Sequence, residues 1–167
     1  MKKLILLFSL IITAGCIQAQ TTEPTGMPPY RILTTDSVYV TPANLKHHKT
    51  MLVYFAPDCP HCQHLTMELK EKMKALSDTQ IIMITWSANY DIRAIKNFVH
   101  DYDLKKYPNV IVGTEGYTNL VMKYFKVQTT PYIAVYNSDK KFVKSYSKSP
   151  DIDSLIAVVK SADKKKI

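Results

Sequence analysis

The residues best suited to chemistry are two cysteines, Cys59 and Cys62, in the segment Asp58-Cys59-Pro60-His61-Cys62. At this spacing the two sulfur atoms can bond to each other or share a metal ion. A cysteine reacts as its thiolate, which is both the nucleophile in disulfide exchange and the form that binds metals. The segment therefore favours either thiol–disulfide chemistry or the binding of a soft metal ion.

The elements predicted around the two cysteines give them different surroundings. The apolar run Met51–Ala56 has the length of a strand, and a helical stripe follows at Leu65, Leu69, Met73 and Leu76. Cys59 then falls at the start of a helix, where free backbone N–H groups and the helix dipole stabilise a thiolate. Cys62 lies three residues before Leu65, on the core side. An exposed acidic thiol beside a shielded partner suits exchange, in which Cys59 reacts first and Cys62 resolves the mixed disulfide.

The remaining elements follow from hydrophobic periodicity and turn residues. Strands are predicted at Tyr30–Leu33, Val38–Val40, Gln80–Trp86, Val110–Val112, Tyr132–Tyr136 and Phe142–Tyr146. Helices are predicted around Ile92–Tyr102, over Thr118–Tyr124, and from Ser149 onward, with Ser149 as N-cap and Pro150 at the first helical position. A strand–helix–strand opening requires parallel pairing, and the closing hairpin adds antiparallel strands. The pattern predicts a three-layer α/β/α sandwich with a mixed central sheet.

Length and composition limit the class of protein. The chain has 167 residues, of which 46% are hydrophobic and 22% charged, as in one ordinary soluble domain. This balance excludes a disordered, fibrous or multi-span membrane protein. Four glycines against nine prolines, without a glycine-rich phosphate-binding motif, exclude a nucleotide-binding architecture of that kind. The net charge of +8 comes mostly from scattered lysines, so we expect a solvated basic surface and no nucleic-acid partner.

The first 19 residues resemble a secretory signal peptide. Two lysines precede the apolar run Leu4–Ile12, which is too short to cross a bilayer. Cleavage after Ala19 would release a periplasmic or secreted protein. Alternatively, Thr13-Ala14-Gly15-Cys16 resembles a lipoprotein box, in which Cys16 would carry a lipid anchor and hold the protein on the membrane, facing the periplasm.

The rest of the chain divides into three parts. Residues 20–29 contain several prolines and predict a flexible leader. Residues 30–163 hold every predicted strand and helix and form one domain. Residues 164–167 form a basic tail.

Two motifs together resemble the thioredoxin superfamily. The first is the CPHC segment between an apolar strand and an amphipathic helix, and the second is Thr129-Thr130-Pro131-Tyr132, directly before the closing hairpin. The resemblance implies a thioredoxin-like fold for residues 30–163 and a redox-active disulfide between Cys59 and Cys62. It also implies that Pro131 is a cis-proline facing the cysteines and that the backbone of Thr130 binds an extended substrate peptide.

The residues between the two cysteines tune the redox potential in this family. Pro60-His61 is the pair of strongly oxidising disulfide-forming relatives, and His61 can stabilise the Cys59 thiolate. Asp58 opposes this effect. Val53 stands where thioredoxin has a buried aspartate, and the large helical insertion of the oxidising relatives is missing. The direction of electron flow therefore stays open.

The sequence predicts an exported thiol–disulfide oxidoreductase that acts on protein thiols and disulfides. We expect a monomer with no organic cofactor and no bound metal, recycled by a redox partner in the membrane. The alternative is a periplasmic copper or zinc metallochaperone that uses Cys59 and Cys62 with the nearby His61 and His64.

Overall fold

A computed structural model describes residues 26–45, 48–86 and 92–164. Its centre is a seven-stranded mixed sheet with the order β2-β1-β5-β4-β3-β6-β7. The strands are β1 (Ile32–Thr34), β2 (Tyr39–Val40), β3 (Lys49–Tyr54), β4 (Thr79–Thr85), β5 (Val110–Thr114), β6 (Tyr132–Tyr136) and β7 (Phe142–Tyr146). Strands β3, β4 and β5 pair in parallel, and the other neighbours pair antiparallel.

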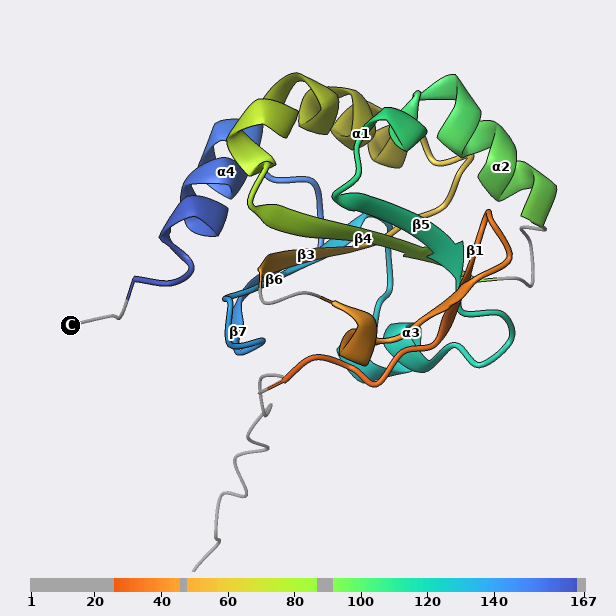
Figure 1. The fold of residues 1–167 in the computed structure, drawn as a ribbon, viewed down its shortest axis with the longest axis horizontal. Coiled ribbons are helices and arrows are strands. Elements are labelled where there is room, and N and C mark those ends of the chain that lie inside the picture. Colours follow the sequence, from red (N-terminus) through yellow and green to blue (C-terminus); the bar gives the residue numbers. More distant parts are fainter. Residues whose placement is uncertain (1–25, 46–47, 87–91, 165–167) are drawn as a thin grey trace, which may run out of the picture.

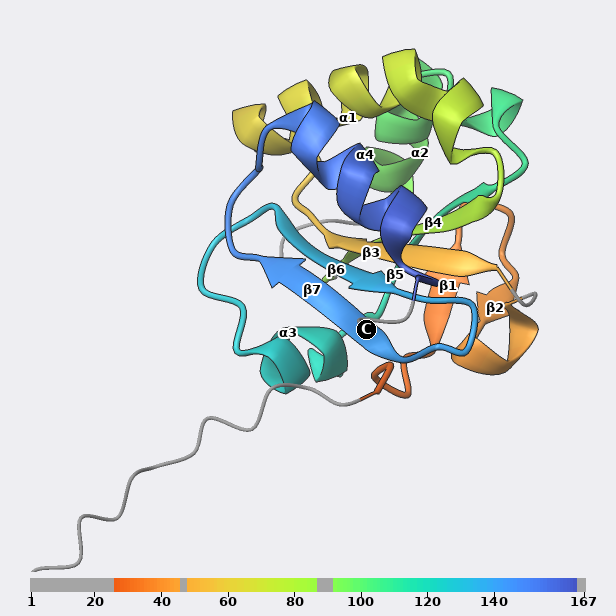
Figure 2. The same cartoon turned by 90° about the vertical axis from the view of Figure 1, so that its left-hand side faces the viewer.

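Helices cover both faces of this sheet. They are α1 (Pro60–Lys72), α2 (Ile92–Asp101), α3 (Leu120–Phe125) and α4 (Ile152–Ser161), with 3₁₀ turns at Pro42–Asn44, Met73–Leu76 and Leu104–Lys106. Figure 1 shows α1, α2 and α4 on one face and α3 on the other, and the rotated view in Figure 2 agrees. The predicted three-layer α/β/α arrangement with a mixed sheet is confirmed.

The interior strand β3 contributes to two hydrophobic cores, one on each face of the sheet. Its side chains alternate between the faces of the sheet. Met51 and Val53 pack beneath α1, α2 and α4, while Leu52 and Tyr54 pack toward α3 and the N-terminal strands. The residues of the apolar run Met51–Ala56 are all buried, which explains why no polar residue interrupts it.

The start of α4 differs from the prediction. Its N-cap is Asp151, whose carboxylate accepts a hydrogen bond from the backbone N–H of Ser154 at 2.8 Å. Ser149 is therefore not the N-cap, and Pro150 precedes the cap instead of opening the helix. Asp and Ser are similarly good N-caps, but a carboxylate also interacts favourably with the helix dipole.

The terminal segments fall mostly outside the described residues. The predicted signal peptide at 1–19, with Cys16, lies wholly outside them, as do most of the leader and of the basic tail. Among the described helices, none is long and apolar enough to cross a membrane.

Candidate active site

The two cysteines lie at the point where β3 meets α1. Phe55 and Ala56 continue the buried strand beyond Tyr54, and the N–H of Phe55 donates to the carbonyl of Ile84 at 2.9 Å. The chain then turns, and the N–H of Cys59 donates to the carbonyl of Ala56 at 3.1 Å. The side chain of Gln63 supports this turn, since its Nε2 donates to the carbonyl of Pro57 at 2.9 Å. The first cysteine is thus held at the end of a rigid strand.

Cys59 is the N-cap of α1 and is partly exposed, as predicted. Partial burial works to raise the pKa of Cys59, but hydrogen bonds outweigh it and leave the pKa below that of an ordinary thiol. These bonds come from the backbone N–H groups of Cys62 and His61 and from the side chains of Thr130 and Cys62. The thiolate is therefore favoured at the sulfur that a substrate can reach.

Cys62 is its buried counterpart, with 1% of its surface exposed, and it packs into the core beneath α1. Burial raises the pKa of Cys62 to about 12, and the nearby Cys59 adds to the effect. Cys62 therefore keeps its proton and can donate it toward the Cys59 thiolate. Both cysteines are free thiols in this structure, so the disulfide between them stays a prediction.

Thr130 and Pro131 face Cys59 across the site. The peptide bond between them is cis, as the family resemblance implies. The Sγ of Cys59 lies 3.5 Å from the carbonyl oxygen of Thr130. The sheet explains this proximity, because β6 is antiparallel to β3 and Tyr54 pairs with Tyr132. The residues just after β3 and just before β6 therefore meet at one edge.

The other predicted residues lie at the surface around this edge. Pro60 and His61 are exposed at the start of α1, and His61 lines a groove of about 440 Å³. His64 is also exposed and lies 3.6 Å from the carboxylate of Glu68, one turn further along the helix. His61 is thus beside the candidate substrate groove, while His64 faces solvent.

The groove has a second wall that the sequence analysis did not identify. Ser147, Lys148 and Ser149 line it together with His61, and Thr129, Thr130 and Pro131 complete its lining. Residues Ser147–Ser149 follow β7, whose last residue, Tyr146, pairs with Ile133 of β6. The predicted hairpin was a usable signal, because it requires the end of β7 to lie beside the start of β6.

A protein metal site needs several ligating side chains that converge on one ion. No group of three or more histidine, cysteine, aspartate or glutamate side chains is placed to hold a metal ion in residues 26–45, 48–86 and 92–164. Two thiols remain as candidate ligands, and they lie three residues apart at the start of α1, close enough to hydrogen-bond each other.

Comparisons with known proteins agree with this geometry. The model of the family described as "Thioredoxin-like domain" matches residues 39–160. A protein disulfide isomerase-like protein of Arabidopsis thaliana is 24% identical over 110 residues, which are 66% of this chain and 22% of that protein. The chain therefore spans about a fifth of the length of the curated relatives that it matches.

Solved structures with the same fold include two classes of protein. A secreted disulfide oxidoreductase of Mycobacterium tuberculosis, homologous to DsbE of E. coli, has a TM-score of 0.66 and 19% identity, over 80% of this chain and 96% of that one. A copper-bound ScoI of Arabidopsis thaliana has a TM-score of 0.64 and 20% identity, over 81% and 96%.

Proposed function

This chain belongs to the thioredoxin-like domain family, and from that premise we propose that it is an exported thiol–disulfide oxidoreductase that exchanges disulfides with other proteins through Cys59 and Cys62. The proposal rests on one observation above all. A partly exposed thiol of lowered pKa stands beside a buried thiol whose pKa is raised to about 12, and both face a cis-proline. This asymmetry assigns the first attack to Cys59 and the resolving step to Cys62.

In the reducing direction, the Cys59 thiolate attacks a substrate disulfide and releases one substrate thiolate. The mixed disulfide is resolved when Cys62 loses its proton and attacks the Sγ of Cys59. This step releases the second substrate thiolate and leaves a Cys59–Cys62 disulfide, so two electrons pass from the pair to the substrate. In the oxidising direction the same steps run in reverse, and the substrate gains the disulfide.

Pairing of the substrate backbone with Thr130 would hold the attacked sulfur near Cys59. The carbonyl of Thr130 already lies 3.5 Å from the Cys59 Sγ, so a peptide that pairs there passes directly over the reactive thiol. Holding the two sulfurs in this geometry replaces a bimolecular encounter with a positioned one.

Export is the second part of the proposal. It rests on the predicted signal peptide at residues 1–19, and the secreted oxidoreductase among the structures of the same fold supports it. Attachment through a lipidated Cys16 is the alternative to release after Ala19. Reoxidation or reduction of the cysteine pair would then depend on a redox partner in the membrane.

A trapping experiment tests the activity. Replacing Cys62 with alanine removes the resolving thiol, so mixed disulfides between Cys59 and substrate proteins should accumulate. A reductant should cleave these mixed disulfides and release the substrate proteins. Cys59→Ala is the matched control and should trap nothing. Failure of the Cys62→Ala variant to trap any protein would count against the proposed activity.

The reduction potential determines the direction of electron flow. A reduction potential of about −120 mV would identify a donor of disulfides, and a reduction potential of about −270 mV would identify a reductase. His61 should raise this potential by stabilising the Cys59 thiolate.

Copper binding is the alternative function, because a copper-bound Sco protein shares the fold. Cys59 and Cys62 would be the ligands, with a third from His61 or a partner protein. The same two variants separate the functions, since a metallochaperone would lose stoichiometric copper binding in both variants and would trap no substrate in either.

A further inference from the structure

The groove beside Cys59 has an unbalanced charge. Of the residues that line it, Lys148 is the only one with a permanent charge, and none carries a carboxylate, as far as the described chain shows. Lys148 is exposed and makes no ion pair with a described residue. Its ammonium group is therefore available to a ligand in the groove.

The acidic side chains nearest along the chain are engaged elsewhere. The carboxylate of Asp151 accepts the backbone N–H of Ser154 at the start of α4. Asp153 forms an ion pair of 2.6 Å with Lys72 of α1. Neither carboxylate lines the groove, so neither neutralises Lys148 there.

The opposite side of the CPHC turn has the reverse charge. A depression of about 450 Å³ lies there between the start of α1 and α2, and Asp58 and Asp101 line it. A chain segment bound across Cys59 thus has a basic groove on one side and an acidic depression on the other.

The walls of the groove are held together. Thr129 Oγ1 donates to the carbonyl of Ser147 at 3.0 Å, which ties the loop before β6 to the loop after β7. Ser149 contributes a buried hydroxyl that has no hydrogen-bond partner among the described residues. The groove therefore keeps its shape, and the ammonium group of Lys148 is the charged group that it offers to a polar side chain.

We propose that Lys148 is a specificity-determining residue, and that the groove selects protein segments with a carboxylate close to the reactive cysteine. This inference rests on the proposed exchange function, because it concerns the same site. Charge complementarity supports the preference for a carboxylate, because an acidic side chain that enters the groove meets Lys148 and no carboxylate. A basic side chain in the same place gains no partner and is repelled by Lys148.

Exchange with matched peptides tests the inference. Three peptides would differ only in the residues flanking a single cysteine, which would be Glu, Gln or Lys. Each would carry thionitrobenzoate in disulfide linkage, so that attack by the reduced protein releases the coloured thiolate. The second-order rate constant should be about three- to tenfold higher for the Glu peptide than for the Gln peptide at low salt, and lowest for the Lys peptide.

Two variants assign the preference to Lys148. Lys148→Glu should reverse the order of the Glu and Lys peptides, because a carboxylate would then stand where the ammonium group lined the groove. Lys74→Glu makes the same change in net charge in the 3₁₀ turn that follows α1, about 20 Å along the helix from His61, and should keep the wild-type order. Comparing ratios between variants cancels the intrinsic reactivity of each peptide.

The outcomes separate this inference from the function on which it rests. Equal Glu-to-Gln ratios in the wild type and in Lys148→Glu would overturn the role of Lys148 while the exchange activity stands. No release of thionitrobenzoate from any peptide by the wild-type protein would overturn the proposed function and this inference together. A Glu preference that disappears in high salt, where exposed charges are screened, would support the electrostatic origin.

Discussion

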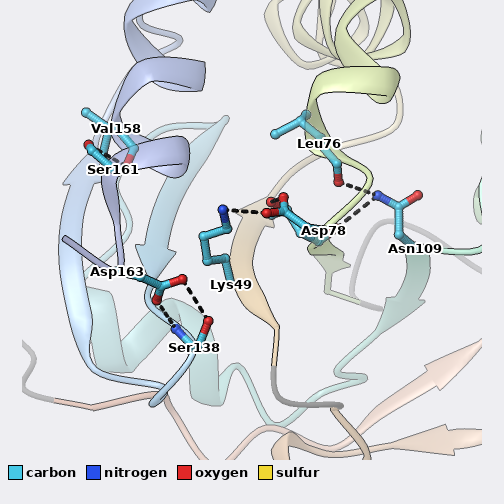
Figure 3. A network of polar contacts seen from close by, with 9 residues as sticks. Lys49, Leu76, Asp78, Asn109, Ser138, Val158, Ser161 and Asp163 are labelled. Atoms are coloured by element: carbon cyan, nitrogen blue, oxygen red, sulfur yellow. Dashed lines mark hydrogen bonds and ion pairs between the residues drawn. The ribbon is translucent and has the colours of Figure 1, made fainter.

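Polar groups at the two ends of the parallel strands differ in whether they are bonded to other parts of the protein. Where the strands begin, polar side chains bind one another (Figure 3). The Nζ of Lys49 lies 2.6 Å from Asp78, and Asn109 Nδ2 donates to the carbonyls of Leu76 and Thr79 at 3.0 and 2.9 Å. Where β3 ends, the thiol of Cys59 and the ammonium of Lys148 instead remain available to a partner.

This difference separates stability from chemistry within one sheet. At the starting end, side chains replace the water that backbone carbonyls and charges would otherwise need. Asp163 similarly accepts from the N–H and the hydroxyl of Ser138, which joins the end of α4 to the turn after β6. At the other end the same strands position groups that must exchange partners during a reaction. Changes to the bonded side chains at the first end should alter stability, and changes at Cys59 and Lys148 should alter rates.

The largest expected contrast is between the two thiols themselves. Because the pKa of Cys59 is lowered and that of Cys62 is raised to about 12, alkylation of the reduced protein at pH 7 should modify Cys59 on the order of a thousand times faster. The rate at Cys59 should reach half of its plateau at a lower pH than an ordinary thiol does, and the rate at Cys62 should still be rising at pH 10. Alkylation with mass mapping between pH 4 and 10 measures both.

Cys62→Ala and Cys59→Ala provide the controls, since each leaves a single thiol in the described domain. Comparable rates at the two cysteines near neutral pH would remove the asymmetry from which the order of the two chemical steps was inferred.

Much of this reactive end was predictable because short-range patterns specify it. The apolar run before Cys59 and the stripe after Cys62 place the first cysteine at a helix start and the second in the core, and both positions are confirmed. The cis form of the Thr130–Pro131 bond follows from the family resemblance, not from any local pattern. The proximity of Thr130 to Cys59 depends on the pairing of β3 with β6, which lie far apart in the chain.

The features that sequence reasoning missed depend on partners from other elements. Lys49 is 8% exposed although lysine is normally a surface residue, because Asp78, just before β4, reaches its ammonium group. Glu115 is buried because one carboxylate oxygen accepts from the hydroxyl of Tyr54 and the other from the N–H of Val121. The residues of the groove wall, Ser147–Ser149, lie in a polar loop without periodicity, so only the pairing of β6 with β7 reveals their position.

A change at the starting end should lower stability without slowing exchange. Asn109→Ala removes the side-chain amide that donates to the carbonyls of Leu76 and Thr79. We expect this change to lower the free energy of unfolding by about 1–3 kcal/mol. Urea denaturation measures the loss. Asn97→Ala, at an exposed position of α2, should change stability by less than about 0.5 kcal/mol. The contrast between the two ends of the strands would be contradicted if Asn109→Ala slowed exchange at Cys59 and left stability unchanged.

The smallest expected effect comes from the ion pair between Lys49 and Asp78. The hydrogen bond from Lys49 holds the pKa of Asp78 below its usual value, so the pair stabilises the fold above the unfolded pKa of 3.8. That stabilisation is lost as the pH falls through the lowered pKa of the folded state. Because Asp78 is mostly exposed, Lys49→Met should cost no more than about 1 kcal/mol at pH 7, and the difference should vanish toward pH 2.

Lys105→Met is the matched control, because Lys105 pairs with Asp36 at 2.9 Å but both partners are exposed. Its effect at pH 7 should be smaller than that of Lys49→Met, since solvent and salt screen the exposed pair more strongly. Urea midpoints of the two variants and the wild type at pH 7 and pH 2 make the comparison. If the loss in Lys49→Met were the same at both pH values, then Lys49 would stabilise the starting end by packing its methylene groups, and charge pairing would not account for its burial.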